Sequence, residues 1–379
     1  MRSASDRRKV IKRSVKQNFS FPGIFVEHPV KPAPIVDPLA LPDRVARDGS
    51  RWPTKPRIGY GAFWEPVLEN TSSGSVLRLR DAMRETADVV DIGVQIPTVT
   101  RTALRAVHLK YRCGRLTSTW GNSRLTDAHL ARALRNSIAK NSRVRDLDAV
   151  LTIDSLAVLP EPFFIYAYSS WDQLAYSADP PQLFAAQRMV SPATMSRRRD
   201  RQVAVYEHAT GIIAETKWLA RCLTELSGIP AEKVQVVHPA IPAGPSLSIR
   251  RKTRIREAPR RKLLFITGQS EPEHFYRKGG DLILKALVIL RRDYDPEITV
   301  TMAGMSRWPI PGAEPPAGIN FAGALPSAEV EQLYDSHDLF VMPSRLETFG
   351  IVLVEALSRG LPCVARNACA MPEIVTPGK

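Results

Sequence analysis

Cysteine, long apolar runs and acidic side chains are all scarce in this chain of 379 residues. The four cysteines have neither the spacing of a metal site nor the density of a disulfide-bonded scaffold, so neither is expected. No run of eighteen apolar residues occurs, and therefore no transmembrane helix is predicted. The basic N-terminus lacks the apolar stretch of a secretory signal. A cytoplasmic setting, with a peripheral place on the inner face of the membrane as an option, is expected.

Basic residues outnumber acidic ones, with 53 Lys and Arg against 38 Asp and Glu, which gives a formal net charge of +15. Such an excess favours an anionic partner, which would be a nucleotide diphosphate, anionic lipid headgroups or nucleic acid. Residues 101–115 and 191–209 are especially basic, and both are predicted to be largely helical. A solvated surface is the alternative interpretation of either run.

The order of apolar runs predicts an α/β chain. Residues 1–54 are basic and then Pro-rich, and we expect them to be irregular. In 55–243 and in 263–379, short buried strands alternate with amphipathic helices, which favours two Rossmann-type domains with parallel, doubly wound sheets. A basic linker at 244–262 is predicted to join them.

One segment near the C-terminal end carries most of the functional signal. A buried strand at 339–342 is broken by Pro343, and an apolar helix then begins at Gly350. The free N–H groups at the start of that helix favour an anion, above all phosphate. Glu347, just before the helix, would repel phosphate unless it faces a neutral, hydroxyl-rich group, and Glu355 can accept hydrogen bonds from another pair of hydroxyls. The segment therefore predicts a nucleotide-sugar site, and a plain strand–turn–helix with solvated glutamates is the alternative.

The same segment resembles the signature of the retaining glycosyltransferases of family four (group 1), which have the GT-B fold. The elements of that signature are a Pro-Ser pair, a glutamate, a Phe-Gly pair and a second glutamate, present here as Pro343, Ser344, Glu347, Phe349, Gly350 and Glu355. The resemblance extends from about Arg57 to the end and is most specific from Leu263 to Val375. It implies a GT-B-like α/β fold, in which two Rossmann-type doubly wound domains face each other across a cleft. Because the family continues further, the second domain is expected to be truncated at Lys379.

The resemblance also implies an activity in glycan biosynthesis. A hexosyltransferase of this kind moves a sugar from a nucleotide-diphosphate donor to an acceptor hydroxyl with retention of the anomeric configuration. The donor would bind mainly to the second domain and the acceptor, a glycan or a lipid-linked molecule, to the first. Neither a cofactor nor a metal is expected. Peripheral contact with an anionic membrane through the basic helices is an option, and no binding of nucleic acid is expected.

Site residues follow from the matched positions. Glu347 is predicted to contact the reacting sugar, Arg277 and Lys278 to stabilise the leaving diphosphate, and Glu355 to bind the ribose hydroxyls. The other donor-binding residues that the resemblance implies are Thr348, Phe349, Gly350, Ile351 and Val352 around the helix start, Gly74 and Ser75 in a glycine loop, and Ala324 and Leu325 against the base.

One departure from the family pattern keeps a second hypothesis open. The family often has a histidine after the strand that corresponds to 163–166, whereas this chain has Ser169 and Ser170 there. The alternative is a catalytically inactive GT-B-fold binding protein at a membrane or polymer surface.

Overall fold

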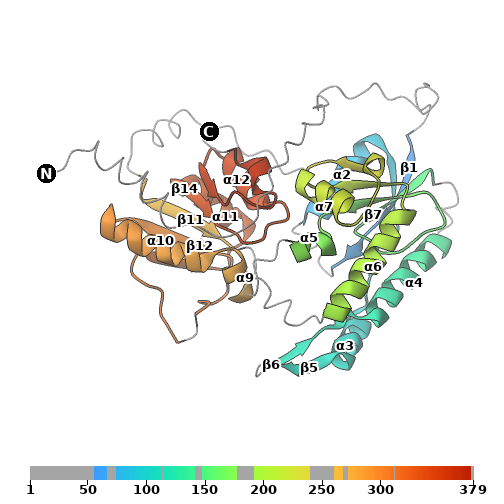
Figure 1. The fold of residues 1–379 in the computed structure, drawn as a ribbon, viewed down its shortest axis with the longest axis horizontal. Coiled ribbons are helices and arrows are strands. Elements are labelled where there is room, and N and C mark those ends of the chain that lie inside the picture. Colours follow the sequence, from blue (N-terminus) through green and yellow to red (C-terminus); the bar gives the residue numbers. More distant parts are fainter. Residues whose placement is uncertain are drawn as a thin grey trace. The chain divides into compact units, whose positions relative to one another are not determined.

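The computed structural model describes residues 55–65, 74–112, 115–140, 147–176, 192–239, 260–267, 272–310 and 312–376. These residues form two separate parallel sheets with helices packed against them (Figure 1), which confirms the predicted α/β class. The predicted tail at 1–54 and nearly all of the predicted linker at 244–262 lie outside the described residues. Within the described ranges, no helix has both the length and the apolar character needed to cross a bilayer.

The first sheet has six parallel strands in the spatial order β10 (Val234–Val236), β9 (Gly211–Ala214), β8 (Phe163–Ala167), β7 (Ala149–Ile153), β1 (Arg57–Gly61) and β3 (Asp88–Asp91). The helices that accompany it are α2 (Ser75–Thr86), α3 (Thr98–Val107), α4 (Arg124–Lys140), α5 (Trp171–Tyr176), α6 (Pro192–His208) and α7 (Lys217–Glu225). Successive residues of β7 enter different cores. Val150 packs in a cluster with Leu134 of α4 and Tyr206 of α6, whereas Leu151 packs with Tyr60 in another. Both faces of this strand are therefore buried, which explains its continuous apolar sequence.

The second sheet has five parallel strands in the order β13 (Ile319–Gly323), β12 (Thr299–Ala303), β11 (Lys262–Ile266), β14 (Leu339–Met342) and β15 (Cys363–Ala365). Its helices are α9 (Pro272–Arg277), α10 (Gly280–Asp293), α11 (Ser327–Ser336), α12 (Ile351–Ser358) and α13 (Met371–Ile374). Leu264 packs with Leu353 of α12, while its neighbour Phe265 packs with Ile283 of α10. This sheet also buries both faces, and its core is distinct from that of the first.

Several smaller elements complete the described structure. They are a short parallel pair, β2 (Phe63–Trp64) and β4 (Val94–Gln95), and the 3-10 turns η2 (Trp120–Asn122) and η5 (Ala231–Lys233).

The basic segment 101–115 differs from its prediction. Helix α3 ends at Val107, and β5 (Leu109–Arg112) and β6 (Arg115–Ser118) then form an antiparallel hairpin. The reason is that the spacing of the apolar residues changes from a helical to an alternating one. From Leu109 onwards apolar and basic residues alternate, and that pattern fits a strand rather than a helix. The short helix α9 ends at Arg277, just before Lys278.

The contact between Gly279 and Pro343 holds the start of α10 against the end of β14. Gly279 has φ 80°, and a Cβ atom added there would lie 2.4 Å from the carbonyl oxygen of Pro343. Glycine is therefore required at this position both for its backbone conformation and for the close approach.

We expect Gly279→Ala to destabilise the protein more than Gly228→Ala, as measured by urea unfolding. Gly228 has a similar φ of 73°, but a Cβ there would meet nothing within 4 Å. The control therefore costs only the left-handed conformation, about 1 kcal/mol, and Gly279→Ala should cost about 1–3 kcal/mol more because of the overpacking. Equal losses of unfolding free energy in the two variants would show that the backbone of Pro343 does not exclude a side chain at position 279.

Candidate functional site

The predicted strand–turn–helix is present. Strand β14 ends at Met342, and Gly350 precedes α12 with a left-handed φ of 106°. Gly350, the N-cap residue of α12, has no side chain that could cap the helix. The first N–H groups of a helix lack intrahelical acceptors, so the start of α12, at Ile351 and Val352, can hold an anion.

Two predicted site residues meet in this turn. The Nζ atom of Lys278 donates a hydrogen bond to Oε2 of Glu347, and Oγ of Ser344 lies 3.5 Å from the same oxygen. Both charged side chains are about one tenth exposed, at 10% for Lys278 and 9% for Glu347. Such a pair is costly to break, because removal of one partner leaves a buried charge without compensation. The geometry therefore fixes one oxygen of the Glu347 carboxylate beside a cation.

Arg277, next to Lys278 in the sequence, bonds to the loop that carries Glu347. Its guanidinium contacts the carbonyl oxygen of Leu346 at 3.5 Å and Nδ1 of His274 at 3.0 Å. Burial lowers the pKa of Arg277, while the negative charge of Glu347 opposes that shift. Arg277 thus adds positive charge near Glu347 and also holds the backbone of the loop.

Arg345 connects the loop to α10. Its guanidinium makes two hydrogen bonds to the carboxylate of Asp281, at 2.6 and 2.8 Å, and its main-chain N–H donates to the carbonyl of Arg277 at 2.8 Å. Burial alone would raise the pKa of Asp281, but the hydrogen bonds from Arg345 hold it below its ordinary value. These contacts make the turn a rigid support for Glu347.

Glu355 lies on α12 and accepts a hydrogen bond of 2.9 Å from the hydroxyl of Tyr334 on α11. Burial, together with the negative charge of Glu355, raises the pKa of Tyr334 above its usual range, so the phenol stays a donor. The side chain of Glu355 is only half-buried. Its orientation is therefore fixed from one side while the carboxylate keeps contact with solvent.

The other donor-binding residues predicted in this domain differ in their exposure and in what they contact. Phe349 is buried, and its ring lies 5.7 Å from the ring of His238, so its side chain serves packing. Thr348 is half-buried in the turn. Ala324 is exposed just after β13, whereas Leu325 packs against the core beside α12.

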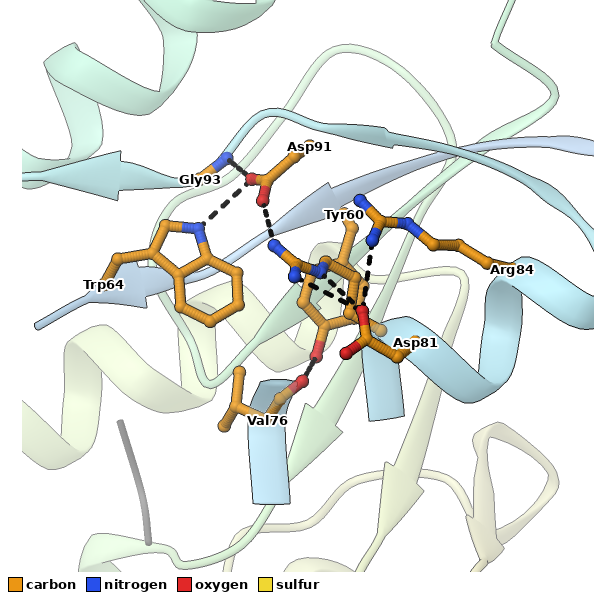
Figure 2. A network of polar contacts seen from close by, with 8 residues as sticks. Tyr60, Trp64, Val76, Asp81, Arg84, Asp91 and Gly93 are labelled. Carbon is orange, nitrogen blue, oxygen red and sulfur yellow. Dashed lines mark hydrogen bonds and ion pairs between the residues drawn. The ribbon is translucent and has the colours of Figure 1, made fainter. Parts of the chain in front are cut away.

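Gly74 and Ser75 start helix α2 in the first domain. Gly74 has φ 77°, and the hydroxyl of Tyr60 holds the first turn by donating to the carbonyl of Val76 at 2.6 Å. Figure 2 shows this bond. Arg80 of the same helix also bonds to Asp91, the last residue of β3, at 2.8 Å. The predicted glycine loop therefore ends at a helix start that is tied to β1.

Sequence reasoning missed two acidic residues at strand ends. Glu215 follows β9, and Asp154 follows β7. Burial raises the pKa of Glu215 to about 8, with further contributions from the charges of Glu347 and Asp154, and burial also raises the pKa of Asp154 to about 6. An acidic residue directly after a buried strand is the signal that would have found both, because ligands of parallel sheets bind at the carboxyl ends of strands.

Glu373 was also missed. Its carboxylate accepts hydrogen bonds from the main-chain N–H groups of Lys217 at 2.8 Å and Trp218 at 2.7 Å, and so caps the start of α7. Next to this cap, Trp218 packs in a small apolar cluster with Leu346. A carboxylate at a helix start is favoured by the helix dipole, which explains this contact.

The described residues contain no group of three or more His, Cys, Asp and Glu side chains that could hold a metal ion.

Part of the chain is similar to known proteins. Residues 253–379, about a third of the chain, match the family model of glycosyl transferases group 1. Sulfoquinovosyl transferase SQD2 of Arabidopsis thaliana is 51% identical over 55 residues, which are 14% of this chain and 11% of that protein. Phosphatidyl-myo-inositol mannosyltransferase of Propionibacterium freudenreichii is 30% identical over 129 residues, 34% of this chain and 31% of that protein. The matched segments thus span a third or less of these two relatives.

The described fold is similar to that of a solved structure. The structure of WaaG, a glycosyltransferase involved in lipopolysaccharide biosynthesis, aligns with a TM-score of 0.51 at 14% identity, over 83% of this chain and 82% of that one. The chain therefore has the GT-B fold, as predicted.

We expect the variant Glu215→Gln to be more stable than the wild type at pH 8.5 and equal to it near pH 4.5. In the folded state Glu215 keeps its proton up to about pH 8, whereas the unfolded chain loses it near 4.5, so stability falls as the pH rises through this window. The shift corresponds to a gain on the order of 4 kcal/mol for the variant at high pH. Urea unfolding across the pH range measures the difference.

The matched control is Glu225→Gln on the exposed side of α7, which should follow the wild type at every pH. If Glu215→Gln keeps the slope of the wild type, the buried carboxyl does not take up the proton that is assigned to it.

Proposed function

We propose that this protein is a retaining glycosyltransferase, which moves a sugar from a nucleotide-diphosphate donor to an acceptor hydroxyl. The observation that carries the proposal is the buried pair of Lys278 and Glu347 at the start of α12. One carboxylate, one cation and a free helix start are the groups that a sugar diphosphate needs, and they lie in the segment that matches the group 1 family model.

The proposed chemistry distributes these groups along the donor. Glu347 accepts hydrogen bonds from the hydroxyls of the sugar, Glu355 accepts them from the ribose, and the first amides of α12 bind phosphate. Lys278 and Arg277 stabilise the negative charge that develops on the leaving diphosphate. The bond between the anomeric carbon and the phosphate oxygen breaks, and the acceptor oxygen bonds to the same carbon from the same face. The acceptor proton passes to the leaving phosphate oxygen, so no strong protein base is required.

We propose that this reaction uses no metal. A metal would neutralise the leaving diphosphate, and Lys278, Arg277 and the start of α12 supply positive charge for the same task. Addition of a chelator should leave the turnover of the donor unchanged.

We expect Glu355→Gln and Lys278→Ala to weaken binding of the donor nucleotide about tenfold or more, because each removes a charge-assisted hydrogen bond. Calorimetric titration with UDP-, GDP- and ADP-sugars measures this loss. Glu329→Gln, an exposed carboxylate on α11, is the matched control and should bind like the wild type.

Unchanged affinity in both site variants would reject the donor assignment. Urea unfolding of Lys278→Ala belongs in the same experiment, since the variant leaves Glu347 buried without its partner. Hydrolysis or transfer of the donor sugar by the wild type would exclude the alternative of an inactive binding protein.

We further propose that the hairpin of β5 and β6 contacts an anionic lipid surface, which would suit a lipid-linked acceptor. Tyr111 and Leu116 pair directly across the hairpin and are 73% and 67% exposed, and Leu109 lies on the same face at 50%. Lys110, Arg112 and Arg115 of the same hairpin add basic residues by sequence. Apolar and basic residues side by side on an exposed element are typical of proteins that bind the membrane interface.

The basic helix α6 is a weaker candidate for such a contact. Arg198 bonds to Asp127 at 3.1 Å, Arg199 bonds to Asp172 at 2.5 Å, and Arg201 donates to a main-chain carbonyl. Its charges are thus largely used inside the domain, which also weakens the hypothesis of nucleic-acid binding through this helix.

We expect the double variant Tyr111→Ser, Leu116→Ser to bind phosphatidylglycerol vesicles at least tenfold more weakly than the wild type, because two apolar side chains no longer enter the interface. Co-sedimentation with vesicles measures the change. Val288→Ser removes an apolar side chain from α10 that is 60% exposed and serves as the control. Equal binding by all three proteins would exclude the hairpin as the contact.

A further inference from the structure

The first domain contains a cavity of about 200 Å³ that no part of the proposed donor site uses. It lies where β7 and β8 end, and helices α4, α5 and α6 supply its other walls. The lining combines carboxylate, guanidinium, hydroxyl and indole groups. In parallel sheets this end of the strands is where ligands bind.

Both arginines that line the cavity already make hydrogen bonds to other groups of the protein. Arg198 donates to Oδ1 of Asp127 at 3.1 Å, and Arg201 donates to the carbonyl oxygens of Ser155 and Leu156 at 3.3 and 2.5 Å. Together with Asp154, the carboxylates offset the guanidinium groups. The cavity is therefore polar without a strong excess of positive charge, and a phosphate group is not the ligand that it favours.

Three polar atoms of the lining residues lack a hydrogen-bond partner within the described structure. They are Oδ2 of Asp127, Oδ1 of Asp154 and Nε of Arg198, and all three are buried. Two are acceptors and one is a donor. A hydroxyl group both donates and accepts, so a ligand with several hydroxyls can satisfy all three atoms, whereas a phosphate would satisfy only the arginine.

The backbone at Asp154 supports a role for its side chain. Its φ of 63° is one of two positive values at non-glycine residues in the described ranges. The conformation is fixed by hydrogen bonds from the Asp154 N–H to the carbonyl of Tyr166 at 2.9 Å and from the N–H of Leu156 to the carbonyl of Asp154 at 3.0 Å. Strained residues of this kind cluster at binding sites, where the strain places a side chain.

Trp171 gives the cavity one apolar wall. The guanidinium of Arg198 lies 5.1 Å from the centre of the indole ring, and this cation–π contact orients the two side chains together. An aromatic wall beside fixed polar groups is suited to a ring with apolar C–H faces and polar edges.

We propose that this cavity binds an uncharged, polyhydroxylated ring, a pyranose or a cyclitol, that belongs to the acceptor. Asp154 and Arg198 bind its hydroxyls, and Trp171 packs against its C–H face. The inference rests on the proposed function only in naming the ligand as an acceptor, because a transferase must hold its acceptor beside the donor.

The test titrates the full chain with methyl α-D-glucopyranoside, methyl α-D-mannopyranoside and myo-inositol, with glucose 6-phosphate and inorganic phosphate as charged probes. Ligand-observed NMR detects the weak binding expected of single rings. We expect at least one neutral ring to bind, and Asp154→Asn and Arg198→Lys each to weaken it about tenfold or more. Asn tolerates a positive φ, so Asp154→Asn keeps the backbone. Asp88→Asn, an exposed aspartate on β3, is the control and should bind like the wild type.

Absence of binding by every neutral ring would overturn the proposal, and so would tighter binding of phosphate or glucose 6-phosphate. Binding that persists in Asp154→Asn and Arg198→Lys would place the ring elsewhere and would also overturn it. Nucleotide binding by the same preparation separates the two proposals. If the nucleotide binds and no ring does, the cavity assignment fails alone; if a ring binds and no nucleotide does, the donor site fails alone.

Discussion

The close approach of Gly279 to Pro343 is the constraint on which the candidate donor site depends. It brings the start of α10 against the turn after β14, so that Lys278 and Glu347, 69 residues apart in sequence, form a buried ion pair. A side chain at position 279 would separate them. Arg345 then fixes the turn by its two bonds to Asp281. The pair is costly to bury, and its position just before the start of α12 is understandable if a ligand with its own charge completes it.

Much of the fold could be predicted because its signal is local. Buried parallel strands such as 149–153 and 339–342 read as short apolar runs, and a glycine before an apolar helix marked the start of α12. The hairpin at 109–118 was not predicted, because a basic segment with interleaved apolar residues fits either period over so few residues.

The site could be predicted only in part, for a different reason. The positions around Glu347 belong to one continuous segment with a recognisable pattern. The contacts of Glu215, Asp154 and Glu373 depend on which strand ends and helix starts come together, and that is a property of the folded chain. Burial is also invisible in a sequence, so the raised pKa of Glu215 could not be inferred from its neighbours.

The structure shows where part of the positive charge is used. The net charge of +15 favoured an anionic partner, and residues 101–115 and 191–209 were the especially basic segments. The arginines of α6 instead bond to Asp127, Asp172 and main-chain carbonyls, and Lys278 is paired with Glu347. Charged side chains that are paired within a domain help to form a site there, and they contribute little to the attraction of an anionic membrane. The hairpin, where apolar side chains are exposed beside basic residues, is therefore the element on which a membrane contact would depend, and the cavity under α6 is the element that would select a neutral acceptor.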